Sequence, residues 1–149
     1  MLDRLQAELK ASMLARDTAR TGVLRMALAA YKNEAVAKGL GPQGVIADPE
    51  GIAVMKRLVK SREDSVAQYA AAGYPDRAAS EQAEITVLKE FLPAMLEGGA
   101  LEAAVRAAIA QTGAQSRKDM GAVMKALQVA HGAAFDGKAA SQIVTSLLA

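Results

Sequence analysis

The sequence contains no cysteine, and this absence removes several classes of chemistry at once. Disulfide bonds, thiolate nucleophiles and zinc sites built on thiolates are all excluded. A chain without cysteine fits a reducing compartment. Histidine, the other residue that often carries catalysis near neutral pH, occurs once, as His131.

Aromatic residues are scarce as well, at 3% of the 149 residues, and tryptophan is absent. The hydrophobic residues make up 52% of the chain and are therefore mainly aliphatic. Ala, Leu, Met and Lys are strong helix formers. The scarcity of rings also argues against a protein that stacks single-stranded bases. We expect an aliphatic core between closely packed helices.

Long apolar runs are missing too, since none approaches the roughly 18 uninterrupted residues that a membrane span needs. The first residues, Met1 to Leu5, include an acid and lack the apolar segment of a secretory signal. We therefore expect a cytoplasmic protein that does not contact a membrane.

Strand patterns are absent, because no alternating or β-branched run lies between turn signals. The helical spacing of apolar residues predicts an all-α, multihelical fold. It consists of an N-terminal bundle of about four helices, followed by a small tail domain of three helices. The longer helices are expected at about 2–16, 18–38, 48–72 and 76–91.

Turn and cap residues place the remaining boundaries. Thr18 or Thr21 is expected to cap the second helix, and Ser141 to open the last one. The stretch from Glu97 to Gly99 is the best linker candidate. We therefore predict a helical bundle domain at residues 1–96 and a tail domain at residues 97–149.

The net charge of +2 is too small to indicate nucleic acid binding by itself, but it is unevenly distributed. Residues 1–99 hold 13 Lys or Arg and 13 Asp or Glu, and are neutral. Residues 100–149 hold five cations and three acids. The excess positive charge thus lies in the C-terminal third, an asymmetry that chance also produces in numbers this small.

No group of residues forms a self-sufficient catalytic constellation. No serine in the chain has the spacing of a nucleophile elbow that would use His131. His131 with Asp136 would supply two metal ligands, whereas a stable site needs three or four. Glu63 and Asp64 are neighbours that point about 100° apart on a helix, so they cannot share a proton. We expect no metal and no cofactor.

Two groups of basic residues remain as candidate binding surfaces. One, on the second and third predicted helices, consists of Arg25, Lys32, Lys56, Lys60 and Arg62. The other, around the predicted sixth helix and the last loop, consists of Arg117, Lys118, Lys125 and Lys138. Such side chains neutralise phosphates without reading sequence, which suits structured RNA, and DNA is not an expected partner. The pattern alone leaves open that these cations only lie on solvent-exposed helix faces and bind nothing.

Several short segments, in this order along the chain, carry a resemblance to a known family. They are Arg25-Met26, Tyr31 to Glu34, Lys60 to Ser65, Glu84-Ile85, Phe91 to Pro93, Ser116 to Met124, and Asp136 to Lys138 followed by Ile143, Val144 and Leu147. Together they resemble the YqeY family over nearly the whole chain. That family is similar to the C-terminal part of the B subunit of the aspartyl/glutamyl-tRNA amidotransferase.

The resemblance implies a helical bundle followed by a three-helix tail that helps to hold the body of a tRNA. It also implies the label of a carbon–nitrogen ligase with glutamine as amide donor. No residue here is a candidate for the phosphate handling or the glutamine attack that such a ligase needs.

The family's tail motif maps onto single residues of this chain. Lys118 and Lys125 are the implied phosphate contacts, and Gly121 is implied to permit a close approach. The structural positions of the motif are Ser116, Asp119, Gly121, Asp136 and Gly137, with Ser116 and Asp119 capping the sixth helix. The chain departs from the family at Ala133, Ala134 and Phe135, where a glycine and a basic residue are usual.

Three hypotheses of function follow. The first is a stand-alone, non-catalytic protein that binds tRNA or associates with the tRNA-charging or tRNA-dependent amidotransferase machinery. The second is a protein–protein adaptor or homo-oligomer that uses its Met- and Ala-rich faces. The third, implied by the resemblance, is an amidotransferase component with carbon–nitrogen ligase activity.

Overall fold

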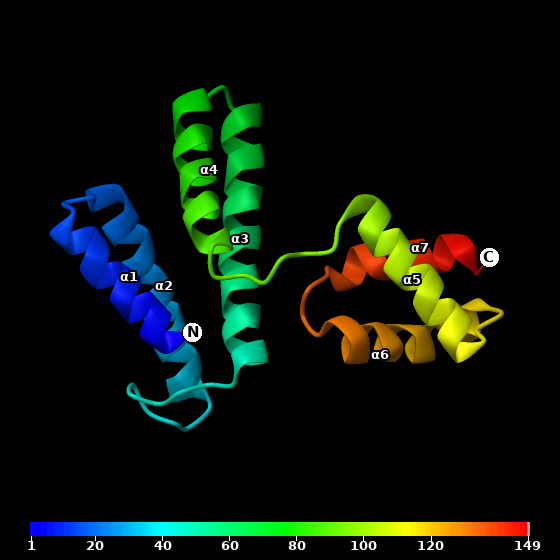
Figure 1. Ribbon diagram of the computed structural model, residues 1–149. Coiled ribbons are helices and arrows are strands. Elements are labelled where there is room, and N and C mark those ends of the chain that lie inside the picture. Colours follow the sequence, from blue (N-terminus) through cyan, green and yellow to red (C-terminus); the bar gives the residue numbers. More distant parts are fainter. Residues whose placement is uncertain (149) are drawn as a thin grey trace. The chain divides into compact units, whose positions relative to one another are not determined.

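A computed structural model describes residues 1–148 as helices joined by turns and loops (Figure 1). In this part of the chain there is no strand, only an isolated bridge between Leu96 and Phe135. The all-α prediction is therefore confirmed. The elements are α1 (Leu2–Leu14), α2 (Thr18–Ala37), α3 (Asp48–Ala71), α4 (Pro75–Lys89), α5 (Gly98–Thr112), a 3-10 turn (Arg117–Asp119), α6 (Met120–His131) and α7 (Gly137–Leu147).

The chain divides into two compact units, Met1–Leu92 and Pro93–Ala149, which we call the body and the tail. The body holds α1 to α4 and the tail holds α5 to α7. Gly98 and Gly99, expected in a linker, form the first turn of α5 instead. The irregular stretch between the last body helix and the first tail helix is 90–97.

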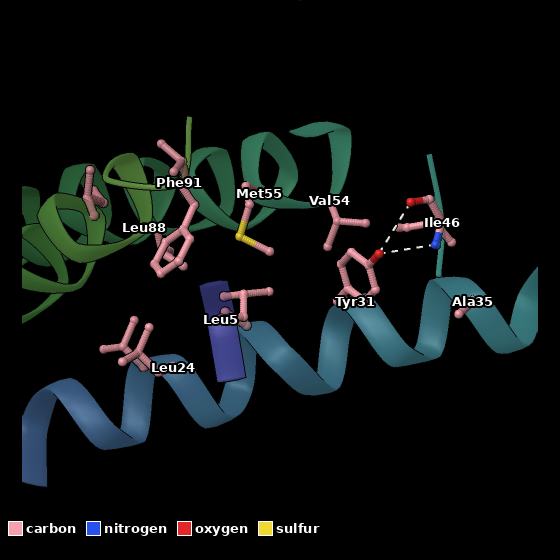
Figure 2. Packing of buried hydrophobic residues seen from close by; sticks show 13 residues of the cluster. Leu5, Leu24, Tyr31, Ala35, Ile46, Val54, Met55, Leu88 and Phe91 are labelled. Atoms are coloured by element: carbon pink, nitrogen blue, oxygen red, sulfur yellow. Dashed lines mark hydrogen bonds between the residues drawn. The ribbon is translucent and has the colours of Figure 1, made fainter. Parts of the chain in front are cut away.

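Each body hairpin pairs two consecutive helices that run in opposite directions, α1 with α2 and α3 with α4 (Figure 1). The residues between α1 and α2 are Ala15 to Asp17, too few for anything but a tight reversal. Both hairpins contribute to one aliphatic core, with Leu5 of α1, Leu24 of α2 and Leu88 of α4 fully buried (Figure 2).

Tyr31 is the largest fully buried side chain of the body core, at 1% exposure. Its hydroxyl accepts a hydrogen bond from the backbone N–H of Ile46 at 3.1 Å and donates one to the carbonyl of the same residue at 3.3 Å (Figure 2). Both backbone groups belong to the loop before α3 and are buried. The single hydroxyl therefore satisfies two groups that would otherwise be buried without partners.

The tail has its own core. Val105 of α5, Val123 of α6 and Val144 of α7 are each 0% exposed, and they pack together with Leu127 and Phe135. Gly113 ends α5 with a left-handed backbone, φ 67°, which a residue with a side chain rarely adopts. The three short helices thus bury an aliphatic cluster among themselves.

Two predicted helix starts are corrected by the structure. The cap of α2 is Asp17, whose carboxylate accepts from the N–H of Arg20 at 3.0 Å. Thr21 is buried and its hydroxyl pairs with that of Ser12 at 2.9 Å, so it is not available as a cap. The last helix begins at Gly137 rather than Ser141.

The earlier start of α7 follows from an acid. Asp136 accepts from the N–H of Ala139 at 2.7 Å, as an N-cap does. The Ser141 hydroxyl instead donates to the carbonyl of Lys138 at 2.9 Å, inside the helix. A carboxylate at the helix N-terminus also interacts favourably with the helix dipole, so Asp136 caps α7 in place of Ser141.

Replacing Tyr31 by phenylalanine tests the role of its hydroxyl. Tyr31→Phe keeps the ring but leaves the buried N–H and C=O of Ile46 unpaired, which costs about 1–3 kcal/mol. We expect urea denaturation to show a loss of stability in this range. The matched control is Tyr74→Phe, because Tyr74 is 53% exposed, and its stability should stay unchanged. Equal stability of both variants would contradict the role assigned to the hydroxyl.

Candidate nucleic-acid interface

The tail presents basic side chains around the start of α6. Arg117 and Lys118 lie in the 3-10 turn, and Lys125 lies two turns further along the chain. All three are exposed. Among residues 1–148 none of them forms an ion pair, whereas Arg106 of the same unit is paired with Glu102 at 2.7 Å.

Gly121 lies between Lys118 and Lys125 on the first turn of α6. Gly121 and Lys125 are four residues apart and share one helix face. A Cβ built at Gly121 would meet no heavy atom of the described chain within 4 Å. The resemblance implied a close approach at this glycine, and no described residue makes it. The glycine therefore leaves a bare backbone position between two lysines.

Asp119 holds the 3-10 turn in place. Its carboxylate Oδ2 accepts from the N–H of Gln115 at 2.9 Å and from the N–H of Ser116 at 3.1 Å. The predicted capping box of Ser116 and Asp119 is present, but it closes the 3-10 turn, and α6 itself begins at Met120. The two N–H groups stabilise the charged form and lower the pKa of Asp119 below its ordinary value.

Lys138 is separated from Arg117 and Lys118 by the fold. It lies in the first turn of α7, which runs back along α6 in the opposite direction (Figure 1). The start of α7 is therefore near the end of α6, about 18 Å from its beginning if 12 residues rise 1.5 Å each. Lys138 is exposed, but it does not lie beside Arg117 and Lys118.

The segment from Ala133 to Phe135, where the chain departs from the family resemblance, is part of the packing of the tail. Phe135 is 5% exposed and belongs to the tail core. Next to it, the carbonyl of Ala134 accepts from the N–H of Leu96 at 2.7 Å. The segment thus anchors the start of the tail to the loop before α7. It fills the core where the family usually has a glycine and a basic residue.

Arg62 is not part of an exposed basic surface. Its side chain is 10% exposed, and its Nε donates to Glu84 Oε2 at 2.8 Å. A second guanidinium N–H donates to the carbonyl of Leu58 at 3.0 Å, and the Sδ atom of Met26 lies against the group. Arg62 therefore joins α2, α3 and α4 from inside the body.

The remaining body cations of the predicted surface face different neighbours. Lys60 is exposed on α3, between Arg57, which pairs with Glu34 of α2 at 2.8 Å, and Glu63, which pairs with Lys89 of α4 at 3.9 Å. Lys56 is four residues before Lys60 and lies on the same side. Arg25 lines a hollow with Met13 of α1.

Lys32 is seven residues after Arg25 and shares its face of α2. Arg25 lines a hollow with Met13 of α1, whereas Lys56 and Lys60 lie on α3. Because Arg62 lies inside the body, the other cations of the predicted surface remain as two groups, Arg25 with Lys32 on α2 and Lys56 with Lys60 on α3.

The sequence does not single out two exposed cations on the same side of the body as Arg25. They are Lys10 of α1 and Arg16 of the turn after it. A signal for Arg16 is present in the sequence. Only Ala15, Arg16 and Asp17 separate the two helices, and none is glycine. A side-chain-bearing residue must therefore take the left-handed backbone that ends a helix in this way.

No described helix combines the length and apolar composition of a membrane span. Within residues 1–148 no group of three His, Cys, Asp or Glu side chains is placed to hold a metal ion. His131 is exposed at the end of α6. The candidate site is thus an exposed basic helix start on an all-helical scaffold.

Comparison with known proteins identifies this scaffold. A family model described as Yqey-like protein matches residues 2–148, so the chain belongs to the YqeY-like family. The chain is also similar to a protein of Saccharomyces cerevisiae named "Altered inheritance of mitochondria protein 41, mitochondrial". In strains YJM789 and ATCC 204508 / S288c the two proteins are 30% identical over 89 residues, 59% of this chain.

The matched segment covers 46% of the yeast protein's length, so it spans about half of that relative. The name of the yeast protein assigns it to mitochondria and states no activity. The cytoplasmic location of the present chain stays a prediction.

Titration of Asp119 tests how the basic turn is held. The pKa of Asp119 is lower in the folded protein than the ordinary aspartate pKa of about 3.9. The hydrogen bonds of its carboxylate therefore stabilise the turn fully above that pH, and this stabilisation is lost as the pH falls through the folded pKa. We expect the NMR amide signals of Gln115 and Ser116 to titrate together, with a midpoint below about 3.9. Asp119→Ala should abolish this titration. A midpoint at or above the ordinary value would refute the assigned hydrogen bonds.

Proposed function

We propose that the protein is a non-catalytic tRNA-binding member of the YqeY-like family, which contacts the RNA backbone through the start of α6. The observation that supports this proposal most strongly is a pair of exposed lysines, Lys118 and Lys125, that form no ion pair within residues 1–148 and have bare Gly121 between them. A lysine without a carboxylate partner can neutralise a phosphate at no loss of an internal ion pair.

The geometry suits a shaped RNA better than a single strand. Phosphate contacts need only cations at a suitable spacing, which Lys118 and Lys125 provide, with Arg117 beside them. Stacking of unpaired bases needs exposed rings. The tail holds one aromatic residue, Phe135, and it is buried in the core. A structured RNA such as tRNA, recognised by its backbone, is the partner that this surface fits.

Gly121 adds a steric argument. An exposed glycine in a helix is less stable than alanine by about 0.8–1 kcal/mol, so its presence is not explained by the stability of α6. Without a Cβ, the helix surface between the lysines is low enough for a phosphate or ribose to approach the backbone. The family resemblance, in which the tail helps to hold tRNA, agrees with this use of the position.

Titration of labelled tRNA at two salt concentrations tests the proposal. The variant Lys118→Ala/Lys125→Ala should weaken binding for every tRNA sequence tested. It should also reduce the slope of log K against log salt by about 2, since each phosphate contact contributes about 1. The proposal would be contradicted if the protein did not bind tRNA at low salt, or if the variant bound tRNA with the same affinity as the unchanged protein.

The control Lys89→Ala/Arg106→Ala removes the same charge from two cations that already pair with carboxylates, Lys89 with Glu63 and Arg106 with Glu102. It should leave the salt slope near that of the unchanged protein. The non-catalytic part of the proposal is tested separately, by adding the chain to a tRNA-dependent amidotransferase. A faster glutamine-dependent amidation of misacylated tRNA would contradict it.

A further inference from the structure

The outer side of the α1–α2 hairpin carries an apolar hollow that the tRNA proposal does not use. The hollow has a volume of about 480 Å³ and is lined by Gln6, Leu9, Lys10, Met13 and Leu14. Met13 is 51% and Leu14 77% exposed, which is unusual for large apolar side chains on the rim of a well-packed hairpin.

A second hollow adjoins the first and shares Met13 with it. Its volume is about 500 Å³, and its cationic lining consists of Arg16 and Arg25. Thr18 contributes an exposed hydroxyl. Lys32 continues the stripe of Arg25 along α2, seven residues further on. We call this surface, made of Leu9, Lys10, Met13, Leu14, Arg16, Arg25 and Lys32, the α1–α2 face.

The cations of the α1–α2 face share one property: within residues 1–148 none of them pairs with a carboxylate or a ring. Most described Lys and Arg side chains of the body contact a carboxylate or a ring; for example, Arg20 binds Glu8 at 2.8 Å and Glu90 at 2.7 Å. Those for which residues 1–148 supply no such partner are Lys10, Arg16, Arg25, Lys32 and Lys60. All of these except Lys60 belong to the α1–α2 face.

Arg16 occupies a strained backbone position. Its φ is 57°, the only positive φ among the described residues other than glycine. The N–H of Arg16 donates to the carbonyl of Met13 at 3.1 Å, and the N–H of Asp17 to that of Ser12 at 3.0 Å, the pattern of a helix end that normally has glycine. An arginine here lowers stability relative to glycine, so the stability of the turn does not account for the side chain.

From the apolar floor and its unpaired basic rim, we propose that the α1–α2 face docks an amphipathic helix of a partner protein, whose apolar stripe is flanked by Asp or Glu. The leucines and methionine of the face take the stripe, and the arginines and lysines pair with the flanking acids. Along α2 the face extends from the helix start at Thr18 to Lys32, about 21 Å at 1.5 Å per residue, which is room for about four turns of helix.

Other occupants account for less of the surface. RNA would use the cations but would leave Met13 and Leu14 exposed to water. A second copy of the chain, docked face to face, would bring one basic rim against another. Asp17 lies beside Arg16, but its carboxylate accepts from the N–H of Arg20, and within residues 1–148 it forms no ion pair with a cation of the face. A helix with acids beside an apolar stripe satisfies both parts of the face.

Two synthetic peptides of about 18 residues, roughly 27 Å as helices, test the proposal. Both carry leucines at helical spacing; one has flanking glutamates and the other flanking lysines. Fluorescence anisotropy with the full chain should show binding of the glutamate peptide alone. Leu14→Ser and Arg16→Gly should each weaken that binding about tenfold. Arg16→Gly should at the same time raise the melting temperature by about 3 °C, which separates lost binding from lost folding.

Two control variants distinguish this surface from others. Lys60→Gln removes the one unpaired body cation outside the face and should leave peptide binding unchanged. Lys118→Ala/Lys125→Ala should also leave it unchanged, so failure of the tRNA proposal does not affect this test.

Several outcomes would overturn the proposal: no binding of the glutamate peptide, equal binding of the lysine peptide, or indifference to Leu14→Ser and Arg16→Gly. A loss of tRNA affinity in Arg16→Gly without a loss of peptide binding would assign the face to RNA. Binding to phosphatidylglycerol vesicles that Leu14→Ser abolishes would assign it to a membrane. Self-association in sedimentation that Leu14→Ser abolishes would assign it to a second copy.

Discussion

The hydroxyl of Tyr31 is the constraint on which the arrangement of the body depends. It binds both backbone groups of Ile46 and so fixes the end of the long loop between α2 and α3 against α2. The adjoining Gly51 of α3 lies close enough that a Cβ there would be 3.4 Å from the Tyr31 ring. With few aromatic rings available, one ring with a polar tip orders a loop and sets where the second hairpin begins.

Much of the fold could be read from the sequence, because helix periodicity and strong helix formers agree along the chain. The errors concern competition between polar groups, which spacing does not reveal. Thr21 was a plausible cap until the fold paired its hydroxyl with Ser12. The sequence suggests a surface position for Arg62. In the structure Glu84 of α4, about 20 residues further along the chain, pairs with Arg62 inside the body. Phe135 is a departure from the family pattern whose burial the sequence leaves as an alternative, and tertiary packing in the tail core buries it.

The two candidate surfaces differ in how much of them the sequence alone can predict. The lysines at the start of α6 could be named from the sequence, since the motif carries them. The α1–α2 face could not, because its defining property is that its cations lack carboxylate partners in the folded body. Composition shows a neutral N-terminal region, and only the structure shows that many of its acids pair with other cations, such as Glu34 with Arg57 at 2.8 Å. The two surfaces also differ in chemistry: one is polar with a bare backbone position, the other apolar with a basic rim.

The loop anchored by Tyr31 has a practical consequence. Before Ile46 the connection from Gly39 to Val45 contributes nothing to the buried core, and Gln43 is exposed in it. The natural chain has no thiol. A Gln43→Cys substitution therefore gives a single reactive position for a fluorophore or a spin label, without any cysteine to remove first. It belongs neither to the start of α6 nor to the α1–α2 face, so one labelled protein can report on binding to both.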